Sequence, residues 1–414
     1  MPRYEMIEGT SSKFWDITLE GVTVTVRYGR LGTAGQSNTK TFPSSAEAKK
    51  EHDKLVVEKT RKGYLLVGAP TASGAAATPK EAAPHAGTAF KLADVDRLEG
   101  APGDSAEKFM GQKIADYDPE EGLKDAARKA YRLRQEDSVA DFLEAFEQLV
   151  ADPHAGKLKA LVISGWSTDE AGGAADDDYA RKIRKALIDA AGKLTGLAAL
   201  FINDTHGEEY EVSWQYFTDL APLLEAYPKL EHLRVRGDAT GKGKMGTLKS
   251  SALRSLQLEG SSLSRKLVQQ VAAAELPALE YLEIWLGPEE YAEKKPMADL
   301  APILSGELFP KLRYLGLRDS DAADEVAKAV AKAPILRHLE TLDLSLGTLG
   351  DEGAEALIAS PAVAKLQTLD IRRHYVSKAV LKQLKALPVK VLESRSERED
   401  EEGDEGTRYV TVAE

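Results

Sequence analysis

The sequence predicts an α/β protein in which a small α+β domain precedes a solenoid of parallel strands and helices. A Leu-x-x-Leu-x-Leu pattern, with Ile or Val allowed last, recurs eight times between residues 158 and 371. Such a recurrence is typical of stacked strand-and-helix units. Residues 67–89 are rich in Ala, Gly, Pro and Thr, as flexible linkers are. Within the first 66 residues, stretches 14–19 and 22–28 alternate apolar and polar side chains, as half-buried strands do.

The first domain reads as a small sheet covered by one helix. Residues 14–19 and 22–28 alternate in polarity on either side of a Glu20-Gly21 turn, which predicts a β-hairpin. Residues 36–42 read as a third strand. Ser44, followed by Glu47 three residues later, is typical of a helix start. We therefore expect a Lys/Glu-rich helix over residues 45–62.

Several motifs of this domain occur in the order of a known family. They are Lys13-Phe14-Trp15, Arg27 to Gln36 (RYGRLGTAGQ), Lys40-Thr41-Phe42, Glu58-Lys59 and Lys62-Gly63-Tyr64. Residues 3–66 thereby resemble a WGR domain, with Tyr28 where the name-giving motif has Trp. The resemblance implies contact with a DNA end or backbone through six residues: Tyr28, Gly29, Arg30, Gly35, Gln36 and Lys40. An aromatic ring can stack on a nucleotide and Arg can bind a phosphate, while such a domain can also dock a protein.

Charge and composition limit the remaining functions. The chain has 414 residues and a net charge of −12. It contains no Cys, which excludes disulfides and thiolate metal sites. Residues 1–66 carry eleven Lys/Arg against eight Asp/Glu, whereas residues 393–406 carry eight acids and two arginines. Any nucleic-acid contact therefore belongs to the first domain. No apolar run approaches the length of a membrane span, about 18 residues. We expect a cytoplasmic protein, and we expect it to bind no cofactor.

The second domain reads as a leucine-rich-repeat solenoid over residues 90–414. The repeats follow one another at a mean spacing near 30 residues, and helices are expected between their strands, for example over 322–332 and 352–359. Residues 90–155 form the expected N-terminal cap, with a strand at 131–134 and a helix at 138–149. The Asn ladder of such repeats is absent, so turn backbone groups must find other partners. As a whole, this domain resembles an uncharacterised family of bacterial leucine-rich-repeat proteins, a resemblance that implies no activity.

The side chains that flank the strand leucines are expected on the concave face. Exposed aromatic residues beside arginines are typical of protein-binding hot spots. The sequence thus predicts a protein partner on a central patch made of six residues: Arg234, Arg236, Tyr281, Trp285, Tyr314 and Arg318. The alternative is that insertions of the chain, at residues 204–216 and 287–300, cover this patch.

The C-terminal segment, residues 393–414, begins with an acidic run. Residues 407–412 then contain alternating β-forming residues, and we expect them to pair with the last strand of the solenoid near residues 389–392. Residues 241–246 match G-x-G-x-x-G but leave no room for a dinucleotide-type helix, and the seven His lack metal-ligand spacing. We therefore expect a non-enzymatic bacterial adaptor for DNA repair, stress or defence. Its first domain would bind DNA or RNA, and its solenoid would bind a protein. The alternative is a purely protein-binding scaffold.

Overall fold

The computed structural model separates into two compact units, residues 1–86 and 87–414. It describes residues 3–8, 11–30, 33, 36–61, 65–67, 90–95, 106–134, 139–165, 176–204, 212–239, 245–261, 263–288, 297–394 and 408–412. The expected linker from residue 68 onward, the glycine-rich loop at 241–244 and the acidic run at 395–407 lie outside the described residues.

The first unit is a five-stranded antiparallel sheet with strand order β4-β3-β2-β1-β5. Its strands are β1 (Arg3–Glu8), β2 (Ser11–Glu20), β3 (Thr23–Arg30), β4 (Gln36–Thr41) and β5 (Leu65–Val67). The predicted hairpin is confirmed as β2 and β3, and Gly21 at its turn has a φ of 59°, a value that glycine adopts without strain. Strands β1 and β5 were not expected. Val67, the first residue of the expected linker, instead ends β5.

Helix α1 (Ser45–Arg61) covers one face of this sheet. Its predicted start is confirmed, because the backbone N–H of Glu47 donates to the Ser44 hydroxyl at 3.2 Å. Trp15, Ile17 and Val24 of the sheet pack against Ala48 of the helix. The core of this unit therefore lies between α1 and the central strands.

The second unit is built on a twelve-stranded sheet with strand order β19-β18-β17-β16-β15-β14-β12-β10-β9-β8-β7-β6. Neighbouring strands from β7 to β19 pair in parallel, and β6 is antiparallel to β7. The four outermost strands are β6 (Lys108–Phe109), β7 (Gln112–Asp116), β8 (Ala130–Leu133) and β19 (Lys390–Leu392). The other eight are β9 (Ala160–Ser164), β10 (Ala199–Asp204), β12 (His232–Arg236), β14 (Ser255–Glu259), β15 (Tyr281–Gly287), β16 (Tyr314–Ser320), β17 (Thr341–Asp343) and β18 (Thr368–Asp370).

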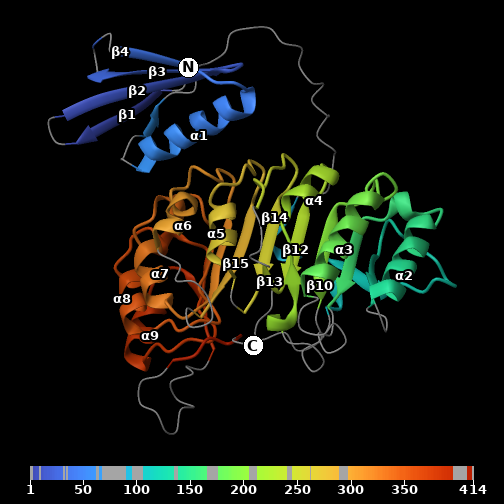
Figure 1. The fold of residues 1–414 in the computed structure, drawn as a ribbon. Helices are drawn as coiled ribbons and strands as arrows, with labels where there is room; N and C mark the ends of the chain where they lie inside the picture. The colour runs from blue at the N-terminus through green and yellow to red at the C-terminus, as the bar shows by residue number, and fades with distance from the viewer. Residues whose placement is uncertain are drawn as a thin grey trace. The chain divides into compact units, whose positions relative to one another are not determined.

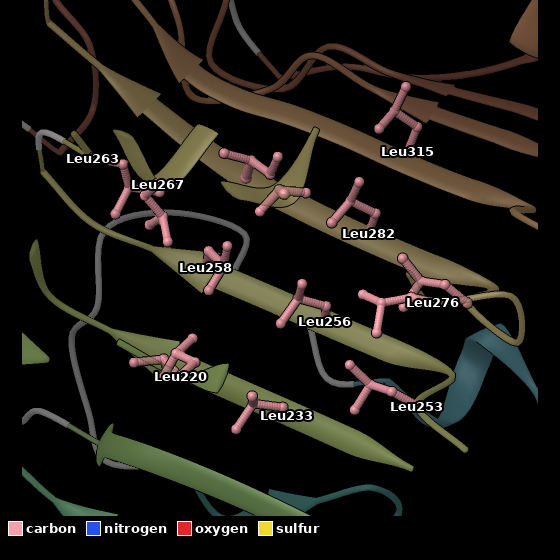
Figure 2. Packing of buried hydrophobic residues seen from close by; sticks show 14 of the residues in the cluster. Leu220, Leu233, Leu253, Leu256, Leu258, Leu263, Leu267, Leu276, Leu282 and Leu315 are labelled. Atoms are coloured by element: carbon pink, nitrogen blue, oxygen red, sulfur yellow. The ribbon is translucent and has the colours of Figure 1, made fainter. Parts of the chain in front are cut away.

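These eight strands confirm the eight predicted repeats, and so the leucine-rich-repeat solenoid. The repeat leucines stand in register from strand to strand, for instance Leu233 beside Leu256 and Leu256 beside Leu282. Figure 2 shows Leu233, Leu256, Leu282 and Leu315 as a row across successive strands. Their burial between sheet and helices forms one continuous hydrophobic core along the unit.

Helices cover one side of this sheet along its length (Figure 1). They are α2 (Val139–Ala151), α3 (Asp176–Ala190), α4 (Ala221–Ala226), α5 (Arg265–Val271), α6 (Met297–Leu304), α7 (Ala323–Val330), α8 (Asp351–Ile358) and α9 (Lys378–Leu384). Short 3₁₀ turns are η1 (Leu92–Asp94), η2 (Ala155–Lys157), η3 (Val212–Trp214), η4 (Pro334–Arg337) and η5 (Val363–Lys365), and β11 (Tyr216–Phe217) pairs with β13 (Asp238–Ala239). The expected cap strand and helix correspond to β8 and α2, and the two expected repeat helices to α7 and α8. No helix among the described residues is long and apolar enough to cross a membrane.

Aspartate side chains accept some of the backbone hydrogen bonds that the missing Asn ladder would otherwise accept. Asp324 Oδ1 accepts hydrogen bonds from the backbone N–H groups of Gly350 at 2.8 Å and Gly353 at 3.0 Å, in the next repeat. Asp351 accepts from the N–H of Ser377 at 2.7 Å in the same manner. The expectation that these backbone groups find other partners is confirmed.

The C-terminal segment returns to the solenoid at a different place from the one expected. Residues 408–412 do not pair with β19. The N–H of Thr411 donates to the Leu346 carbonyl at 2.8 Å, and the N–H of Val412 donates to Asp319 Oδ1 at 3.0 Å. The prediction was wrong because Val412 finds an apolar site, among Val212, Trp285 and Leu346, that the last strand does not offer.

Candidate functional site

Three of the predicted nucleic-acid contacts lie on the same face of the first unit. Tyr28 pairs with Gln36 across β3 and β4, and Val24 pairs with Lys40. Directly paired residues of antiparallel strands point to the same side of a sheet. Tyr28 also pairs with Trp15, whose side chain lies on the face that carries α1. An aromatic ring, an amide and an ammonium group therefore share one face at the β4 edge.

These side chains are accessible. Tyr28 is 44% exposed, and Gln36 and Lys40 are exposed as well. The Lys40 ammonium lies 5.0 Å from the ring centroid of Phe42. Gly29 and the backbone of Arg30 belong to β3, opposite Phe14 and Lys13, whereas Gly35 and the side chain of Arg30 lie outside the described residues.

The opposite face of the same strands has a different chemistry. Hydroxyl pairs span β3 and β4, with Thr23 and Thr41 3.4 Å apart and Thr25 and Thr39 3.1 Å apart. Arg27 next to them donates to Asp16 at 3.2 Å and is thereby neutralised. The free cationic and aromatic groups of this hairpin thus belong to the face of Tyr28.

The six residues predicted for the protein-binding patch lie where the register places them, on the sheet face opposite the repeat leucines. Their expected exposure is wrong, because they are 0–2% exposed. The structure divides them into two groups, each arranged around a buried glutamate.

Glu283 is the centre of the first group. It accepts hydrogen bonds from the Tyr281 hydroxyl, from Trp285 Nε1 at 2.8 Å and from Arg318 at 2.6 Å. Burial alone would raise the pKa of Glu283, but the Arg318 guanidinium and these hydrogen bonds lower it to about 2. Tyr314 stacks on Tyr281 with ring centroids 3.9 Å apart. This carboxylate therefore stays ionised and fixes the aromatic side chains.

Glu259 is the centre of the second group. Arg234 Nε donates to one of its oxygens at 2.8 Å and Arg236 Nε to the other at 3.0 Å. The Arg234 guanidinium also lies 4.4 Å from the ring centroid of Phe201. Both arginines are thus paired with one buried carboxylate, and Asp204 lies 3.9 Å from Arg236 as a second acidic neighbour. Sequence periodicity carries no signal for this pairing.

Several of the described segments of the chain itself cover this face. Val95 is buried against Tyr281 and Tyr314, with Phe90 and Leu92 packed beside it. Val212 and Val412 are buried against Trp285. Coverage by the insertion at 204–216 is therefore seen at Val212. Among the described residues, further cover comes from residues 90–95, from Phe109 and Met110, and from the C-terminal segment, which were not expected to provide it.

The described residues contain no group of three or more His, Asp or Glu that could hold a metal ion. The two units instead present one exposed aromatic and cationic edge and one solenoid with a covered concave face. These features define a class of protein assembled from binding modules.

Comparisons with known proteins agree with that class. The chain contains an N-terminal WGR domain at residues 3–70, and residues 336–357 match a leucine-rich repeat. Two proteins of Escherichia coli K12 are similar to the first unit: the uncharacterised protein YfeS, 43% identical over 54 residues, and YehF, 40% identical over 55. Each match covers 13% of this chain and 22% or 20% of the relative, so the chain spans about a fifth of either.

A crystal structure of a Bacteroides fragilis protein is similar to nearly the whole chain. The match has a TM-score of 0.57 and 27% sequence identity, and it covers 96% of this chain and 97% of the other. The similarity thus extends over both units of this chain. WGR domains and leucine-rich repeats are typically non-catalytic binding modules.

Proposed function

We propose that this protein is a bacterial adaptor whose WGR domain binds DNA ends or backbone and whose solenoid recruits a protein. DNA binding by the WGR domain is supported by the position of Tyr28, Gln36 and Lys40 on one face of its sheet. A ring can stack on a terminal base, and the ammonium and amide groups can contact phosphate. Cytoplasmic DNA repair, stress response or defence is the setting that fits such a pair of modules.

The full chain tests this role in a binding assay with blunt-ended, nicked, single-stranded and covalently closed circular DNA. Tyr28→Ala should weaken binding to DNA ends about tenfold, in line with a lost stacking contact of about 1–3 kcal/mol. Lys40→Ala should weaken binding to every DNA and reduce the salt slope by about 1, as expected for one lost phosphate contact. Lys50→Ala, an exposed lysine of α1, is the matched control and should change neither.

The alternative function is a protein scaffold in which the WGR domain is also a docking module. The observation in its favour is that β4 ends the strand order of its sheet and that all its residues are exposed. Such an edge can pair with an extended peptide. Absence of DNA binding by the full chain at low salt, for every DNA form, would reject the first role and leave this one.

A further inference from the structure

Residues 90–95, here called the strap, lie on the concave face of the solenoid. The Phe90 ring stacks on the His232 ring, with centroids 5.4 Å apart and planes at 23°. The Arg254 guanidinium lies 4.8 Å from the Phe90 centroid, so the ring contacts an imidazole and a cation. Five residues later, Val95 is buried on the ring pair of Tyr281 and Tyr314.

The surface beneath the strap is held in shape from within the solenoid. The two stacked tyrosines donate their hydroxyl hydrogens to Glu283 and Asp343. Arg254 is fixed by Glu280, with a guanidinium nitrogen 2.6 Å from the carboxylate. None of these contacts uses a strap atom. The surface therefore keeps its form when another segment takes the place of the strap.

Side chains alone hold the strap in place. Its own backbone bonds are internal, from Asp94 N–H to the Lys91 carbonyl and from Val95 N–H to the Leu92 carbonyl. Within the part of the chain that the structure describes, no hydrogen bond joins residues 90–95 to the sheet. Beneath Phe90, the Nδ1 atom of His232 is buried without a partner. Displacement of residues 90–95 from the sheet thus breaks no hydrogen bond among the described residues and lets this nitrogen be hydrated.

We propose that this surface is a peptide-docking site which the strap fills in cis. The protein partner recruited by the solenoid would carry an aromatic residue and, five positions later, a β-branched aliphatic residue, and this segment would replace Phe90 and Val95. The inference rests on the proposed recruiting role. A peptide is favoured over a nucleic acid because Val95 marks an aliphatic position on the rings of Tyr281 and Tyr314. The hydroxyl groups of both rings already donate to buried carboxylates and so offer no donor to a phosphate.

A labelled peptide of residues 88–97 tests the site by fluorescence anisotropy. The receptor is the full chain carrying Phe90→Ser and Val95→Ser, which removes the anchors of its own strap. We expect this receptor to bind the peptide at least tenfold more tightly than the unsubstituted chain. A peptide with the same two serines should bind at least tenfold more weakly, whereas a Lys91→Ala peptide should bind unchanged because Lys91 is exposed. Equal affinity of the serine peptide would overturn the proposal.

A second measurement avoids any risk that the substituted receptor misfolds. The strap, which keeps Phe90, is probed through a single thiol at Val95→Cys. Excess peptide should raise the labelling rate of this thiol, whereas the serine peptide should leave it unchanged. No change with the intact peptide, or an equal rise with single-stranded DNA, would overturn peptide docking. DNA binding is measured on the same protein. If the protein binds DNA but not the peptide, the docking site is refuted and the proposed role of the WGR domain stands. If it binds the peptide but not DNA, the proposed role of the WGR domain is refuted and the docking site stands.

Discussion

Acidification from pH 8 to pH 5 is expected to loosen the strap, because His232 must remain neutral beneath Phe90. Burial, with a further contribution from the positive charge of Arg254, lowers the pKa of His232 from 6.5 to about 3. Arg254 is itself paired with Glu280. Once the strap lifts and the ring is hydrated, the pKa of His232 returns toward 6.5.

The sign and size of the effect follow from this difference in pKa. The open strap takes up a proton that the closed strap excludes, so closure is fully stable above pH 6.5 and loses stability as the pH falls toward 3. At pH 5, about 1.5 units below the pKa of the open state, the closed-to-open ratio should fall by up to roughly 30-fold. This corresponds to about 2 kcal/mol.

Thiol labelling can measure this ratio, because the chain contains no Cys. Val95→Cys places one thiol at a site that is 4% exposed, and Ala93→Cys places one at an exposed site of the same strap. The rate for Val95→Cys divided by the rate for Ala93→Cys, with a disulfide reagent that reacts at both pH values, reports the open fraction. Division by the exposed control removes the pH dependence of the thiol itself.

The labelling ratio should rise from pH 8 to pH 5 in the protein with His232. In His232→Phe the stacking ring remains but the titrating nitrogen is lost, so the ratio should stay constant. A flat ratio in the parent, or an equal rise in His232→Phe, would refute the assignment of the pH response to this ring.

Three further substitutions and one control substitution test the buried groups and the proposed DNA-binding edge. Glu283→Gln should lower the free energy of unfolding by up to about 3–5 kcal/mol, because the buried Arg318 then keeps only Asp343, 3.5 Å from its Nε atom. Glu340→Gln, in a partly exposed pair, should lower it by less than about 1 kcal/mol, and denaturant titration compares the two. Val412→Ala should cost about 1–2 kcal/mol in the same titration, since its side chain is 3% exposed, and a loss within error would contradict its packing role. Tyr28→Trp restores the usual motif residue and should tighten binding to DNA ends without changing binding to closed circles, and an equal change on both would argue against stacking on an end.

The repeat strands could be predicted because each obeys a local rule. A leucine pattern with a fixed offset buries the same positions in every strand, and parallel stacking then aligns residues such as Tyr281 with Tyr314. The two-residue turn at Gly21 likewise fixes the register that brings Tyr28 beside Trp15. Both results depend on residues that are close in sequence or repeated at regular intervals.

The cover of the concave face could not be predicted in this way. Period-two alternation tells which face of the sheet a side chain occupies, but not whether a distant segment lies on that face. The covering residues Val95, Val212 and Val412 come from three separate short segments without a periodic pattern. The strand β5 (Leu65–Val67) was missed for a related reason, because three residues are too few to show alternation.

The buried pairing of the solenoid arginines prevents the predicted patch from binding a phosphate. Arg234 and Arg236 share Glu259, and Arg318 is bound by Glu283, so each guanidinium is held by a carboxylate at 2.6–3.0 Å. A phosphate would have to displace that carboxylate inside the protein, at a cost of several kcal/mol. The rest of the chain beyond residue 66 carries a net negative charge. The WGR domain, with a net charge of +3 and Lys40 on the exposed face of Tyr28, is therefore the unit in which electrostatics favours a phosphate backbone.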